Sequence, residues 1–398
     1  MVNAEADELP DEVPEYDLVE EDSLTIDSLS EMVSYTLDWS VQSLLERIGT
    51  SFDINPNFQR RDAWSPERKS LYVESLVLGL PVPQIVLAED ANRKGRFIVL
   101  DGKQRLMTMK QFAAPDANFK GFALKKLEFA RELEGMTFSQ MQSSLTAMDH
   151  AENFLAQPIR TIVVRNWRDP AVLYQVFVRL NQGSLSLSPQ ELRQALYPSE
   201  FTRWINMRSA GSVPIQRARR LKHEDFRMRD AEMLLRFVAF SESIEEYRGN
   251  LRRFLDEACV SGREKWQNHG EEYFEQLAVT CEKTIQRTFL AFGEKNSFLR
   301  FENGSYNRRF NIAVFDLMMA VLGDPSITDV EFEEHRGAIR GIFEKLCETN
   351  RDFSDSLQTT TKSMTSTETR IAEFGREVGT LLGHTLPIVQ RASLMFNK

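Results

Sequence analysis

The stretch that most constrains the fold runs from Phe97 to Leu106 and reads Phe-Ile-Val-Leu-Asp-Gly-Lys-Gln-Arg-Leu. A short apolar run is typical of a buried strand, and Asp-Gly is typical of a tight turn. The Lys-Gln-Arg triplet then opens an apolar segment that permits a helix. The sequence therefore predicts a strand, a turn and a helix start in direct succession.

The residue types at this turn favour contact with an anion. A helix N-terminus presents unpaired backbone N–H groups and the positive end of its dipole. Gly102 allows close approach of the backbone to a bound group, and Lys103 and Arg105 add charged donors. Gln104 brings both a donor and an acceptor. The ordinary alternative is a strand-to-helix turn with polar surface residues, since so short a motif is only a hypothesis.

The net charge of −10 is concentrated at one end of the chain. Of the 59 acidic residues, 14 precede Arg47, which is the first basic residue. The rest of the chain carries 49 basic and 45 acidic residues and is slightly basic. Residues 1–36 are therefore predicted to form an acidic, flexible tail. The alternative is a tail that mimics nucleic acid and covers a basic groove.

Several protein classes are excluded by what the sequence lacks. The three cysteines, Cys259, Cys281 and Cys347, form no C-x-x-C pair, which fits a reducing compartment without a disulfide frame or zinc ribbon. No apolar run approaches the ~20 residues of a membrane span, and no signal peptide is evident. We expect a soluble, cytoplasmic protein. P-loop and G-x-G-x-x-G motifs are also missing.

Hydrophobic periodicity and capping residues divide the chain into a mixed half and a helical half. Thr137-x-x-Gln140 and Ser188-x-x-Glu191 are capping-box patterns at predicted helix starts. The predicted strands span 84–88, 96–100 and 158–164, and the first two form a hairpin. The predicted helices span 37–48, 65–78, 103–112, 170–181, 231–248, 250–259, 268–292, 306–322, 329–348 and 367–382. We expect an α+β protein, with a mixed α/β domain at 37–197 and a mainly α-helical domain at 198–398.

Other blocks flank the Asp-Gly turn in a specific order. They are Asn55-Pro56-Asn57-Phe58-Gln59-Arg60-Arg61-Asp62-Ala63-Trp64-Ser65-Pro66, then Glu74-Ser75-Leu76 with Leu80-Pro81-Val82-Pro83-Gln84-Ile85, then Val176-Phe177-Val178-Arg179-Leu180-Asn181-Gln182-Gly183, and finally Leu187-Ser188-Pro189-Gln190-Glu191-Leu192-Arg193. Together they resemble the ParB/sulfiredoxin-like domain at the N-terminus of GmrSD-type restriction proteins, over about residues 37–197. The resemblance implies a nucleotide-binding, often nucleotide-hydrolysing domain of bacterial defence against phage or foreign DNA. One departure is Lys103, where the family more often has Gln.

The resemblance and the turn chemistry together predict a nucleoside triphosphate site with Mg²⁺. Asp101 is the predicted metal ligand, Gln104 would orient a water, and Arg105 would clamp phosphate. These three are the predicted catalytic residues of a Mg²⁺-dependent NTPase, although whether the protein is an enzyme stays open. The predicted nucleotide-binding residues are Gln59, Arg60, Gly102, Lys103 and Asn181. The alternative is that the arginines pair with Asp62 or Glu74 and only hold the fold together.

A basic cluster between Arg203 and Arg229 is the second candidate. It holds eight cations against two carboxylates, Glu224 and Asp225. Clustered arginine suits the phosphate backbone of nucleic acid and makes binding salt-sensitive. The predicted nucleic-acid-binding residues are Arg217, Arg219, Arg220, Lys222 and Arg227. The alternatives are a solvated helix face or a contact for the acidic tail.

A nuclease centre on this chain is not expected. GmrSD-type proteins often carry an HNH-like domain with His-x-x-Pro, and this chain has His384 and Pro387 with only eleven residues after them. A helix end is the better interpretation. The sequence predicts an NTP-binding sensor or regulator of an anti-phage or restriction system, acting with DNA or a separate effector nuclease. A non-catalytic nucleic-acid-binding scaffold and an antitoxin-like inhibitor of a partner nuclease are the alternatives.

Overall fold

The computed structural model describes residues 31–52, 64–91, 93–180, 188–221, 225, 227–358 and 363–396. They divide into two compact units, with the boundary between Leu196 and Tyr197. We call residues 31–196 the sheet unit and residues 197–396 the helical unit. Most of the predicted acidic tail, residues 1–30, lies outside the described residues.

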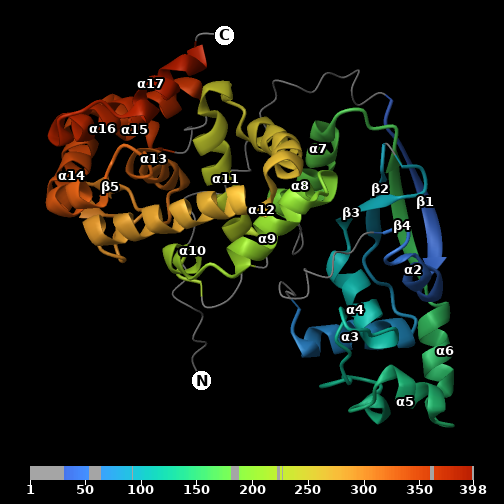
Figure 1. The fold of residues 1–398 in the computed structure, drawn as a ribbon. Helices are drawn as coiled ribbons and strands as arrows, with labels where there is room; N and C mark the ends of the chain where they lie inside the picture. Colours follow the sequence, from blue (N-terminus) through green and yellow to red (C-terminus); the bar gives the residue numbers. More distant parts are fainter. Residues whose placement is uncertain are drawn as a thin grey trace. The chain divides into compact units, whose positions relative to one another are not determined.

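A four-stranded mixed sheet organises the sheet unit (Figure 1). Its strands are β1 (Val33–Ser40), β2 (Ile85–Glu89), β3 (Phe97–Asp101) and β4 (Pro158–Arg165), in the spatial order β1-β4-β2-β3. β2 and β3 form the predicted antiparallel hairpin, β2 runs parallel to β4, and β1 is antiparallel to β4. A mixed sheet unit followed by a helical unit confirms the predicted α+β class.

The helices of the sheet unit follow local signals in the sequence. They are α2 (Val41–Arg47), α3 (Pro66–Val77), α4 (Lys103–Ala113), α5 (Phe138–Ser143), α6 (Met148–Ala156), α7 (Pro170–Leu180) and α8 (Pro189–Leu196). Ser65 caps α3 by accepting the backbone N–H of Arg68, and Pro66 occupies the first helical position. The Thr137-x-x-Gln140 capping box begins α5 as predicted.

The predicted helix at 37–48 is wrong over its first four residues. Residues 37–40 belong to β1, where Leu37 lies opposite Thr161 and Trp39 opposite Ile159. Alternating apolar residues fit a strand as well as the start of a helix, and pairing with β4 decides between them. Ser40 then caps α2, so the helix begins at Val41.

The sheet is buried on both faces. One face contributes Val86, Ala88, Ile98, Leu100 and Val164 to a core cluster completed by Leu173, Tyr174 and Leu192 of α7 and α8. The alternate residues Ile85, Leu87 and Val99 are also buried and point to the opposite face. Burial on both faces explains why β2 and β3 read as continuous apolar runs.

The helical unit is built around α12 (Leu251–Phe292), which consists of two consecutive helices that meet at Gly270. Its elements are α9 (Glu200–Ala210), α10 (Val213–Ala218), α11 (Arg229–Ser243), α12 (Leu251–Phe292), α13 (Ile312–Leu322), α14 (Asp329–Thr349), α15 (Arg351–Ser356), α16 (Met364–Leu382), α17 (Pro387–Ser393), and a small hairpin of β5 (Phe301–Glu302) and β6 (Ser305–Tyr306). Figure 1 shows α12 running through the unit, where it packs against α9, α10, α11, α13 and α14.

Two predicted boundaries in the helical unit are wrong. The first expected helix, at 250–259, continues to a break at Gly270, where φ is 70° and ψ is −169°, and the second, expected from residue 268, follows this break within α12. The helix expected from residue 306 begins instead at Ile312, because Ser305 and Tyr306 pair with β5. No helix among the described residues is long and apolar enough to cross a bilayer.

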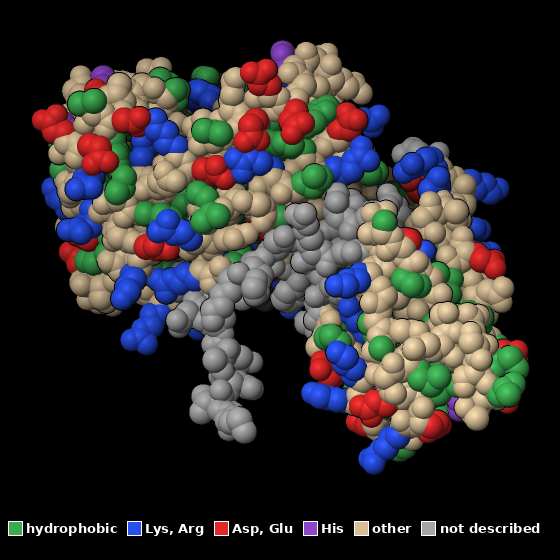
Figure 2. All heavy atoms as spheres, turned by 60° about the horizontal axis from the view of Figure 1, so that its bottom comes forward, with side chains coloured by type: hydrophobic (Ala, Val, Ile, Leu, Met, Phe, Trp, Pro, Cys, Tyr) green, Lys and Arg blue, Asp and Glu red, His purple; other side chains and the backbone are tan. Residues whose placement is uncertain are grey.

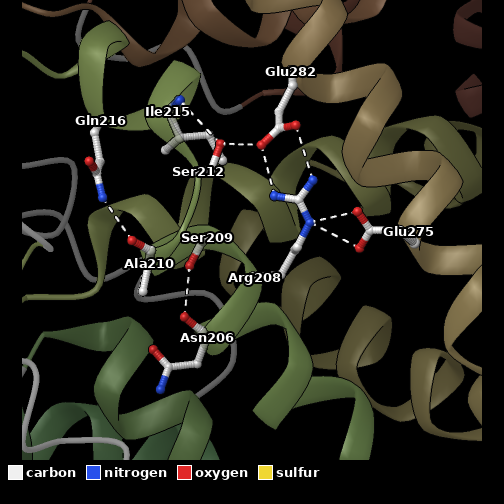
Figure 3. A network of polar contacts seen from close by, with 9 residues as sticks. All are labelled: Asn206, Arg208, Ser209, Ala210, Ser212, Ile215, Gln216, Glu275 and Glu282. Atoms are coloured by element: carbon white, nitrogen blue, oxygen red, sulfur yellow. Dashed lines mark hydrogen bonds and ion pairs between the residues drawn. The ribbon is translucent and has the colours of Figure 1, made fainter.

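An ion-pair network fastens α9 and the α9–α10 turn to α12 (Figure 3). The Arg208 guanidinium donates to both oxygens of Glu275 at 2.9 Å and to Glu282 at 2.8 and 3.0 Å. The Ser212 hydroxyl donates to the same Glu282 carboxylate at 2.6 Å. Burial raises the pKa of Glu282, but the hydrogen bonds from Arg208 and Ser212 lower it by more, so the pKa lies below its ordinary 4.5.

This network predicts a loss of stability in acid. A carboxyl group with a lowered pKa stabilises the fold above its unfolded pKa, and that stability is lost as pH falls through the folded pKa. Glu282→Gln should lower the free energy of unfolding by about 1–2 kcal/mol near neutral pH. The loss should be smaller as pH falls below 4.5, the ordinary pKa of this carboxyl group. Urea denaturation near neutral pH and below pH 4.5 measures the two losses. Glu271→Gln, an exposed substitution in α12, is the control. Equal costs at both pH values would contradict it.

Candidate functional site

The predicted strand, turn and helix start are confirmed at the end of β3. Asp101 is the last strand residue, Gly102 caps α4 with a φ of 101°, and α4 begins at Lys103. Asp101 lies opposite Val86 while Val99 lies opposite Leu87, so the β2–β3 register shifts by one residue just before the turn. Such bulges redirect the end of a strand, which here turns the chain into α4.

Only glycine fits at position 102. The left-handed backbone conformation disfavours other residues, and a Cβ atom would lie 2.9 Å from Ile85 Cγ1. The turn is therefore packed directly against the first residue of β2. This close approach fixes where the first turn of α4 lies relative to the sheet.

Arg105 is buried, and hydrogen bonds hold one of its terminal nitrogens. Its Nη2 donates to Asp101 Oδ2 at 2.8 Å and to the backbone oxygen of Gln84 at 2.9 Å. Asp101 Oδ1 accepts the Gly102 N–H at 2.7 Å. The arginine thus ties together the start of β2, the end of β3 and the first turn of α4. The alternative partner, Glu74, instead accepts the backbone N–H groups of residues 128–130.

Lys103 forms a buried ion pair that the sequence did not predict. Its Nζ lies 2.6 Å from Glu191 Oε1, and the two side chains are 8% and 7% exposed. Glu191 also accepts the Ser188 N–H at 2.7 Å, and Ser188 Oγ accepts the Glu191 N–H, as the predicted capping box requires. The residue that departs from the family pattern therefore has a matching acid in this chain, which joins α4 to α8.

Three buried polar atoms at this site lack hydrogen-bond partners in the described part of the chain. They are Gln104 Oε1, Arg105 Nε and the hydroxyl of Tyr72, which lies on α3. Burial raises the pKa of the Tyr72 phenol, and the nearby charge of Arg105 partly opposes this. Each unsatisfied buried group costs about 1–3 kcal/mol, so three in one region call for an explanation.

The charges at the start of α4 are the reverse of those that stabilise a helix. The first turn of α4 contains no acidic residue but carries Lys103 and Arg105. Cations at a helix N-terminus are disfavoured by about 0.3–1 kcal/mol each, whereas an anion there is favoured. Asp101 and Glu191 compensate these cations within the protein. A bound oxyanion would complement the same end of the helix.

The described part of the site includes only some of the predicted ligands. Asp101, Gly102, Lys103, Gln104 and Arg105 lie together at the turn, whereas Gln59, Arg60 and Asn181 fall outside the described residues. No group of three or more His, Cys, Asp or Glu side chains that could hold a metal occurs among the described residues. A single carboxylate such as Asp101 still suits Mg²⁺ that arrives with phosphate oxygens and water as its other ligands.

Comparison with known families identifies this region. Residues 41–198 match the model of the GmrSD restriction endonuclease N-terminal domain. The matched residues span β2, β3, β4 and helices α2–α8, including the whole turn described above. No curated protein and no solved structure shows significant similarity to the chain.

Sequence reasoning gave no role in the site to three of its residues. Glu191 and Gln84 appeared only within the blocks of the family resemblance, Glu191 also as part of a helix cap, and Tyr72 carried no local signal. The Tyr72 ring lies inside the apolar face of a helix, where a tyrosine is ordinarily a core residue. All three are brought to the turn by packing between elements that are distant in the sequence.

Several arginines of the predicted nucleic-acid cluster have partners within the helical unit. Arg219 is 2% exposed, with its guanidinium 4.4 Å from the Phe310 ring centroid. Arg217 binds Glu294 at 2.7 Å, and Arg220 donates to the backbone oxygen of Lys295 at 2.8 Å. Of these three contacts, only that of Arg217 pairs the cation with a carboxylate.

Contact between this cluster and nucleic acid stays a prediction. Arg227 is exposed, and Lys222 lies outside the described residues. On the face drawn in Figure 2, basic and acidic side chains are interspersed over much of the helical unit.

The His-x-x-Pro motif near the C-terminus lies at a helix end, as predicted. His384 follows the left-handed cap of α16 and lies 3.6 Å from Glu331, and Pro387 begins α17.

We predict that Gly102→Ala is markedly more destabilising than Gly95→Ala. Both glycines have positive φ, but a Cβ at position 95 meets nothing within 4 Å. Gly95→Ala should therefore cost only the backbone penalty of about 1–2 kcal/mol, and Gly102→Ala a further ~1–3 kcal/mol for overlap with Ile85. Urea denaturation compares the two variants. Equal losses would contradict the close packing of the turn.

A double-mutant cycle tests the buried pair of Lys103 and Glu191. Lys103→Met should lower the free energy of unfolding by about 3–5 kcal/mol, because it leaves the buried Glu191 carboxylate without its cation. Adding Glu191→Gln should recover part of this loss, since no unpaired charge remains and Gln still suits the capping box. Denaturant unfolding of both single variants and the double variant gives the coupling. Additive losses would show that the two side chains do not interact.

Proposed function

We propose that the GmrSD N-terminal domain of this protein binds a nucleoside triphosphate with Mg²⁺ at the β3–α4 turn. One observation carries the proposal. Arg105 is buried, anchored on one side by Asp101 and Gln84, and left with an unsatisfied Nε–H beside a helix end that favours an anion. An acceptor supplied by a ligand would offset the cost of burying this donor.

Each residue at the turn has a distinct role in this proposal. Arg105 and the first N–H groups of α4 would contact phosphate oxygens, and Gly102 permits their close approach. Asp101 would hold Mg²⁺, which when bound neutralises phosphate charge. Gln104 would orient a water for attack, which makes hydrolysis of the phosphoanhydride bond the proposed reaction. Lys103 serves to position α4 through Glu191.

The family match supports a role in a restriction or anti-phage system. The GmrSD N-terminal domain is described as part of a restriction endonuclease, and here it is followed by a helical unit outside the match. We propose that the helical unit passes the nucleotide state to DNA or to a separate effector nuclease. The scaffold and antitoxin alternatives need free basic surface or the acidic tail, and the contacts of Arg217, Arg219 and Arg220 give the scaffold less support.

Calorimetry with the four ribonucleoside triphosphates, with and without Mg²⁺, tests the proposal. The wild-type protein should bind at least one of them, more tightly with Mg²⁺. Gln104→Met should leave the fold intact and lower turnover by about a hundredfold, because only the side-chain amide is removed. Gln42→Met, a substitution on the surface of α2, is the matched control. Absence of binding to all four nucleotides would overturn the proposal, whereas binding without turnover would remove only the hydrolytic role of Gln104.

A further inference from the structure

The Tyr72 hydroxyl is buried in the sheet unit, where it forms no hydrogen bond with the described residues. The residue is 7% exposed, and its ring packs edge-on against Trp64 with centroids 5.5 Å apart. Among the described residues its hydroxyl has no hydrogen-bond partner. This chain uses Phe 27 times and Tyr 8 times, so an apolar ring is readily supplied without the polar atom. The hydroxyl therefore lowers the stability of the free protein unless another group satisfies it.

The groups around this hydroxyl limit what its missing partner can be. α3 and α4 pack against each other, and the Arg105 charge is near enough to act on the phenol. Arg105 Nε–H is a donor, and the neutral phenol O–H can also donate. Two buried donors, one of them cationic, lack acceptors in the same region. An anionic acceptor can satisfy both donors, whereas a cation cannot satisfy the Arg105 Nε–H.

We propose that Tyr72 is a ligand-binding residue whose hydroxyl donates to the same phosphate oxyanion that Arg105 Nε–H contacts. This inference rests on the proposed function and extends it, because it adds a side chain from α3 to a site otherwise formed at the β3–α4 turn. Gln104 Oε1 is an acceptor and has a different role, since it would face a water or a hydroxyl group. The site thus has a donor side that holds phosphate and an acceptor side that orients a nucleophile.

Tyr72→Phe tests this inference because it removes one oxygen atom and keeps the ring. With the nucleotide that the wild type binds, and with inorganic tripolyphosphate, the variant should bind about tenfold more weakly. Its melting temperature without ligand should be unchanged or higher, since a buried unsatisfied group has been removed. Tyr306→Phe is the matched control, because the Tyr306 hydroxyl donates to Glu344 at 2.8 Å in the helical unit. That control should melt at a lower temperature and bind with unchanged affinity.

The possible outcomes separate this inference from the proposed function. Equal affinities of wild type and Tyr72→Phe for both probes would overturn the role of Tyr72 and leave the nucleotide site in place. A lower melting temperature of Tyr72→Phe together with unchanged affinity would show that an internal partner satisfies the hydroxyl, and would also overturn it. Failure of the wild type to bind any nucleotide or tripolyphosphate would overturn the proposed function itself, and the inference with it.

Discussion

The sheet unit depends on one buried guanidinium. Arg105 joins the end of β3 to the start of β2 through Asp101 and the Gln84 backbone oxygen, and it lies in the first turn of α4. A buried charge is tolerated only when it is paired and hydrogen-bonded, so these elements must meet at this point. The same contacts leave Nε unsatisfied. The arginine is therefore both a structural link and the main reason to expect an anionic ligand.

The start of α4 illustrates how stability and function are balanced in this domain. Lys103 and Arg105 lie where the helix dipole disfavours cations, and each is compensated by a carboxylate, Glu191 or Asp101. The buried donors that remain unsatisfied lower the stability of the free protein. Binding of an anion would satisfy them and stabilise the fold in proportion to ligand concentration. The nucleotide-sensing role that we propose would use this change in stability on binding.

The sequence predicted elements well where the deciding chemistry is local. Ser65-Pro66 fixed the start of α3, and the polar turn before residue 96 fixed the β2–β3 hairpin. It failed at 37–40, where alternating apolar residues suit two kinds of element, and pairing with β4 made them a strand. It placed the end of the first half of α12 too early, at residue 259, although the helix continues to the break at Gly270. Gln59, Arg60 and Asn181 lie outside the described residues, so their roles in binding stay predictions.

The sequence alone determined the strand, turn and helix start at 97–106, because an apolar run, Asp-Gly and a helix-permissive segment act through neighbouring residues. It could not determine that Lys103 pairs with Glu191, 88 residues away, or that Tyr72 comes to lie near Arg105. Those pairings depend on how α3 and α8 pack around the sheet. Burial removes water as a partner, so only the tertiary structure decided which polar groups are satisfied and which are not.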